Sequence, residues 1–171
     1  DKPYKITAKI QYTNNGSLKE IDRFHDNGNI MLTGGFIAEQ PNGKWIEWYE
    51  NGQKSSETNY KNGKKDGLMT EWHKNGMKIK EGKYINDLME GEWYFKFYVE
   101  EEKHWASLKK GLFKSGDGGN PAINSGIPLN GRHGLFTFFY ENGQKKSEST
   151  YQDGNQIGPT TKWYENGQKE N

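Results

Sequence analysis

The sequence predicts an all-β protein: an elongated antiparallel sheet of stacked 24-residue β-hairpin repeats, with one interrupted repeat. Three observations predict this fold. The letters YENGQK occur at 49–54, 140–145 and 164–169. Only 30% of the 171 residues are hydrophobic, whereas 14% are aromatic and 22 are glycines. Net charge is only +1, so self-repulsion does not keep the chain open, and its aromatic content is too high for a disordered chain.

The glycine of each Asn-Gly pair, here called the turn glycine, sets the register of the repeat. Gly28, Gly52 and Gly76 are 24 residues apart, as are Gly143 and Gly167. Four residues before it stand large aromatic residues (Phe24, Trp48, Trp72, Phe139, Trp163) and three before it His25, Tyr49, His73, Tyr140 and Tyr164. Seven residues before the turn glycine stand mostly bulky residues (Ile21, Trp45, Met69, Trp93, Phe136, Thr160). Nine residues before it stand glycines (Gly43, Gly67, Gly91, Gly134, Gly158). Eight residues after it stand Phe36, Tyr60, Tyr84, Leu108 and Tyr151. Such a period is typical of repeat proteins.

Each repeat is expected to be one hairpin plus a turn into the next. Asn-Gly between aromatic-rich segments predicts a type I′ turn, which needs positive φ at both central residues. Segments such as 45–50 and 53–60 favour strands, and KNGKKDG at 61–67 predicts the connecting turn. The aromatic columns seven and four residues before the turn glycine have opposite parity. Either both faces of the sheet carry aromatic residues or a bulge resets the pleat.

The interruption defines the domain organisation. We expect a single array over 1–171, with N-terminal repeats at 1–97, an irregular repeat at 98–134 and C-terminal repeats at 135–171. The turn expected at residue 100 is lost to Val99-Glu100. The distance to the next turn indicates an insertion of about 19 residues, at about 112–130.

Several classes of function are disfavoured. The near-neutral charge argues against nucleic-acid binding, and no apolar run is long enough to span a membrane. There is no cysteine, no H-E-x-x-H, no G-x-S-x-G and no Walker loop, so we expect no enzyme, no cofactor and no metal. His25 and His73 stand in a tyrosine column and are interpreted as rings stacking in a ladder. Asp117, Asn120 and Asn124 could offer calcium oxygens, but the closing glutamate of an EF-hand is missing.

A glutamate column five residues after the turn glycine is interpreted as structural. Glu57, Glu81 and Glu148 are expected to form a solvated row, pairing across strands with Lys54, Lys78 or Lys145. Repetition at every hairpin argues against catalysis, which usually needs one unique constellation.

The columns, with GKWIEWYENGQK at 43–54, resemble the bacterial variant of the MORN repeat, found in the YwqK family of antitoxins. The resemblance covers nearly the whole chain except about 112–130. It implies a non-enzymatic β-repeat protein, sometimes paired with a toxin, and offers no catalytic residues. Eukaryotic MORN repeats are associated with membrane and lipid attachment, but this chain shows no basic stripe.

If the repeats are scaffold, function is expected where they break. The proposed partner-binding residues are Glu100, Glu101, Glu102, His104, Trp105, Asp117, Asn120 and Asn124. Clustered acids beside a tryptophan suit a basic protein surface such as a toxin nuclease. A loop that is merely tolerated is an equal alternative. The repeat-structural residues are Gly28, Gly52, Gly76, Gly143, Gly167, Trp48, Trp72, Trp163, Tyr60, Tyr84 and Tyr151.

Two functional classes are therefore carried forward, with an enzyme a distant third. The first is an antitoxin or immunity-like monomer that binds one cognate protein, in the bacterial cytoplasm. The second is a secreted or cell-envelope module that uses aromatic faces to bind glycans or proteins, if a signal peptide precedes Asp1.

Overall fold

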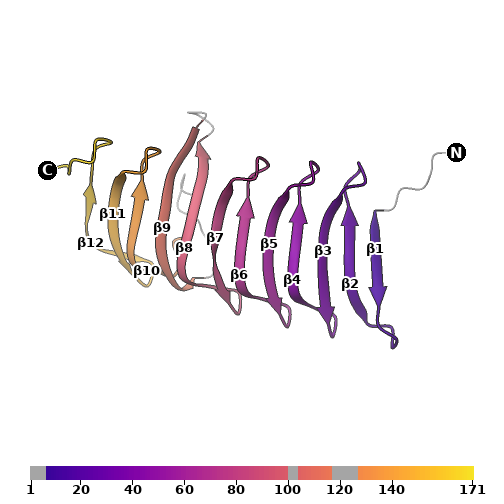
Figure 1. Ribbon diagram of the computed structural model, residues 1–171. Coiled ribbons are helices and arrows are strands. Elements are labelled where there is room, and N and C mark those ends of the chain that lie inside the picture. Colours follow the sequence, from indigo (N-terminus) through magenta and orange to yellow (C-terminus); the bar gives the residue numbers. More distant parts are fainter. Residues whose placement is uncertain (1–6, 100–103, 117–126) are drawn as a thin grey trace. The chain divides into compact units, whose positions relative to one another are not determined.

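The chain forms two compact units, Asp1–Lys78 and Ile79–Asn171. The structure, a computed structural model, describes residues 7–99, 104–116 and 127–171, and only the backbone of 97–99 and 104–109. The described residues contain twelve β-strands and no helix (Figure 1). Each strand runs antiparallel to the next within its unit, which confirms the predicted all-β class of consecutive hairpins.

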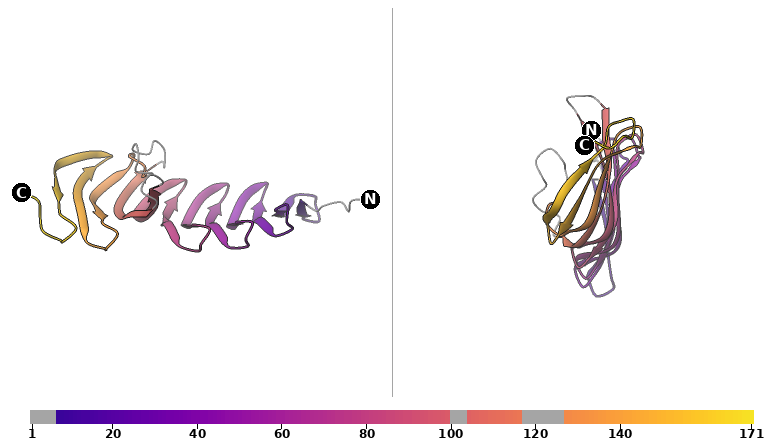
Figure 2. Two further views of the ribbon diagram at one scale, coloured as in Figure 1. Left: turned by 90° about the horizontal axis from the view of Figure 1, so that it is seen from above. Right: turned by 90° about the vertical axis from the view of Figure 1, so that its left-hand side faces the viewer.

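Unit 1 is a single layer of hairpins in chain order (Figure 2). Its strands are β1 (Ala8–Tyr12), β2 (Leu18–Phe24), β3 (Ile30–Ile37), β4 (Gln40–Trp48), β5 (Lys54–Lys61) and β6 (Lys64–Trp72).

Unit 2 continues the pattern with longer strands at its centre. Its strands are β7 (Lys78–Ile85, from the unit boundary), β8 (Leu88–Val99), β9 (His104–Gly116), β10 (Arg132–Phe139), β11 (Lys145–Gln152) and β12 (Asn155–Lys162). The β8–β9 hairpin replaces the lost turn, and its two strands pair as far as Val99 and His104.

The YENGQK turns are not of the predicted type I′. Tyr49 N–H donates to Gln53 O (2.8 Å) and Gly52 N–H donates to Tyr49 O (2.9 Å), which leaves three residues between the paired positions. Gly52 has φ +80°, whereas Asn51 is not among the described residues with positive φ. A type I turn closed by a left-handed glycine explains this geometry, because it needs only one residue at positive φ.

Type I′ turns occur instead at the opposite ends of the strands. Asn62 (φ 50°) and Gly63 (φ 79°) alone separate the paired Lys61 and Lys64. The pairs Ala38-Glu39, Asn86-Asp87 and Asp153-Gly154 are built in the same way.

Of the two alternatives offered for the aromatic parity problem, the structure shows the first: both faces of the sheet carry aromatic residues, and the bulges lie before both columns and do not bring them to one face. The register shifts next to Gly43, Gly67, Gly91, Gly134 and Gly158, all of which have positive φ. On one face the Trp45 ring packs against the rings of Phe36 and Tyr60, with centroid separations of 5.2 Å and 5.8 Å. On the other, Trp72 lies 5.9 Å from Lys54 Nζ, on the side that carries the Glu57 carboxylate.

The column seven residues before the turn glycine provides the core. Trp45, Trp93 and Phe136 each lie over a glycine of a neighbouring strand, where an added Cβ would stand 2.1–2.2 Å from the ring. The side chains that are fully buried, among described residues, are Met89, Trp93, Ile127 and Phe136, all in unit 2. In unit 1 the buried apolar core residue is Met69.

Candidate binding surfaces

The turn asparagines connect successive hairpins. Asn51 Oδ1 accepts a hydrogen bond from Gln53 N–H (3.1 Å), and its Nδ2 donates to Lys74 O of the next turn (2.9 Å). Asn27 and Asn142 make the same inter-turn bond, to Glu50 O (2.8 Å) and Glu165 O (3.0 Å). We call this bond the asparagine clasp. The repeated Asn-Gly is therefore a link between repeats as well as a turn signal.

The ring three residues before the turn glycine also links neighbours. Tyr49 Oη donates to Trp72 O and Tyr140 Oη to Trp163 O, both at 2.8 Å. His25 Nε2 lies 2.7 Å from Trp48 O, which fits an Nε2–H tautomer. The described contacts of this column are therefore hydrogen bonds to the backbone of the next hairpin, whereas stacking of the rings stays a prediction.

The glutamate column carries the predicted lysine partners with altered geometry. Lys54 Nζ lies 2.8 Å from Glu57 Oε2, but along the same strand, and the cross-strand partner is Lys44 (2.6 Å from Oε1). The Glu57 side chain is only 21% exposed, so the expected solvated row is wrong here. Hydrogen bonds from Lys44 and then Lys54 lower the pKa of Glu57. Lys145 Nζ and Glu148 Oε1, 2.6 Å apart, form the ion pair equivalent to Lys54–Glu57.

Most of the predicted partner-binding residues lie outside the part of the chain that the structure describes. Glu100, Glu101, Glu102, Asp117, Asn120 and Asn124 lie outside the described residues. His104 and Trp105 begin β9, opposite Val99 and Tyr98, and only their backbone is described.

The structure describes both ends of the predicted insertion at about 112–130. Residues 112–116 continue β9, where Phe113 pairs with Gly91 and Arg132. Phe113 is buried there between the rings of Trp93 and Phe136, and Gly116 pairs with the buried Met89.

The last residues of the insertion are packed into unit 2. Ile127 is fully buried, and Arg132, 3% exposed, donates from Nε to Pro128 O (2.8 Å) and from Nη2 to Ile127 O (3.1 Å). Its guanidinium lies 5.2 Å from the Phe136 ring and 5.1 Å from Tyr151. We call residues 127–131 the return segment. Periodicity could not reveal its role, because it belongs to no repeat column.

The other face of unit 2 exposes aliphatic side chains in register. Leu135 pairs with Thr150, and Thr150 pairs with Ile157, so the three share one face. Leu112 lies beside them, next to Gly134. Leu112, Leu135 and Ile157 are 44%, 50% and 47% exposed. We call these three side chains the aliphatic row.

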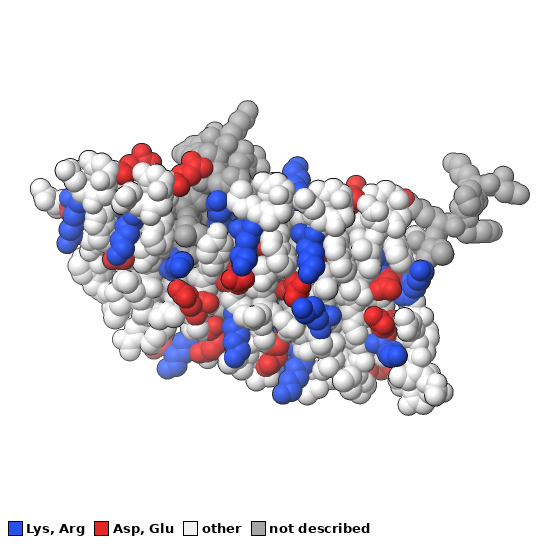
Figure 3. Space-filling model, in the orientation of Figure 1, with Lys and Arg blue, Asp and Glu red and all other residues white. Residues whose placement is uncertain are grey.

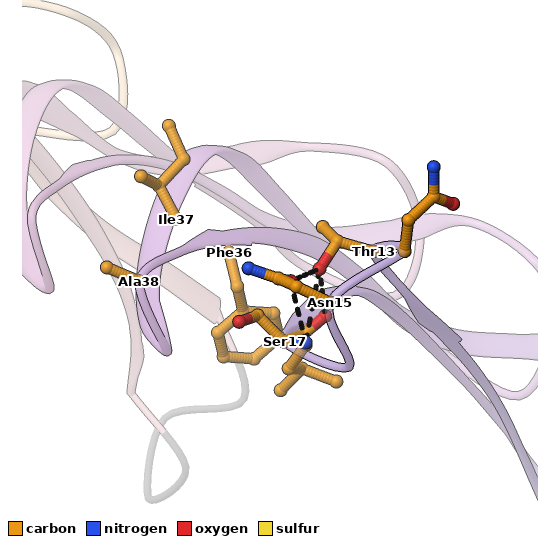
Figure 4. A pocket seen from close by; sticks show the side chains of 8 residues that line it. Thr13, Asn15, Ser17, Phe36, Ile37 and Ala38 are labelled. Carbon is orange, nitrogen blue, oxygen red and sulfur yellow. Dashed lines mark hydrogen bonds between the residues drawn. The ribbon is translucent and has the colours of Figure 1, made fainter.

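A groove of about 650 Å³ opens in unit 1 between the β1–β2 and β3–β4 turns (Figure 4). Its lining includes Thr13, Asn15, Ser17, Phe36, Ile37 and Ala38. The β1–β2 turn has the YENGQK geometry, because Thr13 N–H donates to Ser17 O and Gly16 N–H to Thr13 O. Its neighbour is a two-residue turn, so the two turns differ in length and leave the groove.

Charges of both signs are interspersed on the face of each unit that Figure 3 shows. Groups of acids and histidines able to hold a metal do not occur in the described part of the chain. The same part holds no helix long and apolar enough to cross a membrane.

Fold and turn geometry define a β-hairpin repeat protein. Residues 41–62, 65–86 and 132–153 match the family model of the MORN repeat variant. MORN repeats are non-catalytic and generally mediate binding to proteins or membranes. A comparison with curated proteins finds no match. The YwqK antitoxin assignment and a bacterial source stay predictions.

Proposed function

We propose that this chain is a non-enzymatic protein-binding module that neutralises one cognate protein, as antitoxin and immunity proteins do. The observation that carries the proposal is the aliphatic row. Leu135 and Ile157 both pair with Thr150 on an uncovered face, with Leu112 beside them, whereas the repeat-equivalent positions of Leu135 and Thr150 in the second hairpin of unit 1 hold Lys44 and Asn59. Exposed apolar patches rimmed by polar residues mark interaction sites.

Two observations favour a protein over a membrane or a glycan. Lys54 and Lys145 are paired with glutamates, which reduces the charge available to attract anionic lipid. The aromatic row of unit 2 is engaged internally, since Trp93 contacts Tyr84 (4.9 Å) and Phe136 contacts Phe113 (5.3 Å). Rings packed edge to face in this way offer few free faces for stacking on sugars.

The test is capture of the partner by the full chain and by a Leu135→Lys/Ile157→Lys variant. We expect the wild type to retain one protein stoichiometrically and the variant to lose it, with an unchanged unfolding transition. Leu68→Lys is the matched control, because Leu68 is in the same repeat column and 64% exposed but lies in unit 1. Equal capture by all three proteins would contradict the proposal.

The acidic segment gives a second, separable test. Reversing the charge of Glu100, Glu101 and Glu102 is expected to weaken capture and to reduce its salt dependence, because charge complementarity acts through a screened field. The antitoxin role itself requires that the captured partner is toxic when expressed alone and harmless with this chain. A harmless partner would leave a binding module and remove the antitoxin interpretation.

A further inference from the structure

We propose that Asn15, in the groove of unit 1, is a site of spontaneous deamidation, activated by the Thr13 hydroxyl. The chain has nine Asn-Gly pairs. They are prone to this reaction because glycine places no Cβ beside the attacking nitrogen. Differences in deamidation rate among these pairs must therefore come from the folded structure.

The reaction needs water and no other co-reactant. The Gly16 backbone nitrogen gives up its proton and attacks Asn15 Cγ. The Cγ–Nδ2 bond breaks, and Nδ2 takes up the proton and leaves as ammonia. The resulting succinimide ring is opened by one water at either carbonyl. The product is aspartate or isoaspartate at position 15.

The clasp that restrains other turn asparagines is missing at Asn15. Asn27, Asn51 and Asn142 each donate Nδ2–H to a carbonyl of the next turn at 2.8–3.0 Å. Asn15 Nδ2 has no hydrogen bond among the described residues. The neighbouring turn, Ala38-Glu39, is two residues long, and Glu39 Oε1 instead accepts from Leu18 N–H (2.8 Å).

The Thr13 hydroxyl contacts the amide that must be attacked. Its closest acceptor is Asn15 Oδ1, with Ser17 O farther away at 3.2 Å (Figure 4). A donor at this oxygen polarises the carbonyl and stabilises the negative charge that develops on it during attack. At the clasped turns the same column holds His25, Tyr49 and Tyr140, which bond to the next hairpin instead.

The remaining restraint is common to these turns and does not distinguish them. Gly16, Gly52 and Gly143 each donate their N–H to the residue three positions earlier, at 2.9–3.0 Å. This hydrogen bond must be released at each of these turns before the glycine nitrogen can attack. The difference in rate should therefore reflect the clasp and the hydroxyl.

The experiment is incubation of the full chain in heavy-oxygen water at mildly alkaline pH, followed by peptide mapping with mass spectrometry. The rate at each asparagine is divided by its rate in concentrated urea, which removes the effect of local sequence. We expect this ratio at Asn15 to exceed that at Asn51 by about fivefold or more, the factor for one lost net hydrogen bond. A ratio at Asn15 equal to or below that at Asn51 would overturn the proposal.

Two variants separate activation from exposure. Thr13→Val removes the hydroxyl and is expected to slow the reaction at Asn15 while leaving Asn51 unchanged. Thr13→Ser keeps the hydroxyl and is expected to restore the Asn15 rate. A Thr13→Val rate that is unchanged or raised would remove the role of the hydroxyl, and unfolding curves check that both variants keep the fold.

Discussion

At the scale of single residues, the turn asparagine is more specific than its repetition suggests. Its side chain closes its own turn through Oδ1 and links to the next turn through Nδ2. An aspartate could do the first but not the second, because a carboxylate has no donor. The three clasps that are described explain why Asn-Gly rather than Asp-Gly occupies those turns.

Asn51→Asp is therefore expected to lower the free energy of unfolding by about 1–2 kcal/mol, because Lys74 O loses its donor and faces a negative charge. Urea unfolding at neutral pH measures the change. Asn166→Asp is the matched control, since among the described residues Asn166 Nδ2 contacts only Gln168 Oε1 of its own turn, at 3.3 Å. Equal effects at the two positions would show that the clasp adds nothing.

The Glu57 carboxylate supplies a prediction on pH. Its pKa is lowered in the folded state by Lys44 and then Lys54, so ionised Glu57 favours folding. That contribution is fully present above the ordinary glutamate pKa of about 4.3 and is lost as the pH falls through the folded-state pKa. Glu57→Gln should flatten the fall in stability over this acidic range. Urea midpoints across pH measure it, and Glu141→Gln, on an exposed turn, is the matched control.

At the scale of elements, hairpins and their period could be predicted from the sequence, but the turn types could not. Asn-Gly fits both a two-residue type I′ turn and a longer turn with a left-handed glycine. The choice depends on bonds between hairpins, such as Tyr49 Oη to Trp72 O, which no local pattern contains. The candidate site was harder to predict, because Ile127 is fully buried although it belongs to no repeat column, and its carbonyl accepts from Arg132, a charged residue that is itself buried.

The type I′ turns give opposite predictions at two positions. Ala38 has φ 49°, a region that costs an L-residue energy, whereas Gly63 adopts φ 79° freely. After allowance for unfolded-chain entropy, Ala38→Gly should stabilise and Gly63→Ala should destabilise by about 0.5–1 kcal/mol each. Thermal unfolding measures both. A Cβ at Gly63 meets only ordinary contacts with Gln40, at 3.6 Å, so a larger loss would mean that more than φ is involved.

At the scale of the whole molecule, the two units are stabilised differently. Unit 1 is a single layer whose rings are mostly half-buried, and it relies on clasps, ring-to-backbone bonds and ion pairs. Unit 2 adds the return segment on the side of the Phe136 ring: Ile127 is fully buried, and its carbonyl accepts from Arg132, whose guanidinium lies over Phe136 and Tyr151. This arrangement leaves the opposite face, with the aliphatic row, available for a partner.

This difference predicts the order of local opening. Backbone amides of β8 and β10 should exchange with solvent more slowly than those of β2 and β3, because enclosed apolar contacts raise the free energy of local opening. Ile127→Ala, at a fully buried site, should destabilise unit 2 by about 2–4 kcal/mol and speed exchange in β8 and β10. Hydrogen exchange with mass spectrometry resolves the strands, and Leu135→Ala, at a half-exposed position on the other face, is the control. Uniform exchange in both units, or no response to Ile127→Ala, would mean that the return segment merely rests on the sheet and that the repeats alone set its stability.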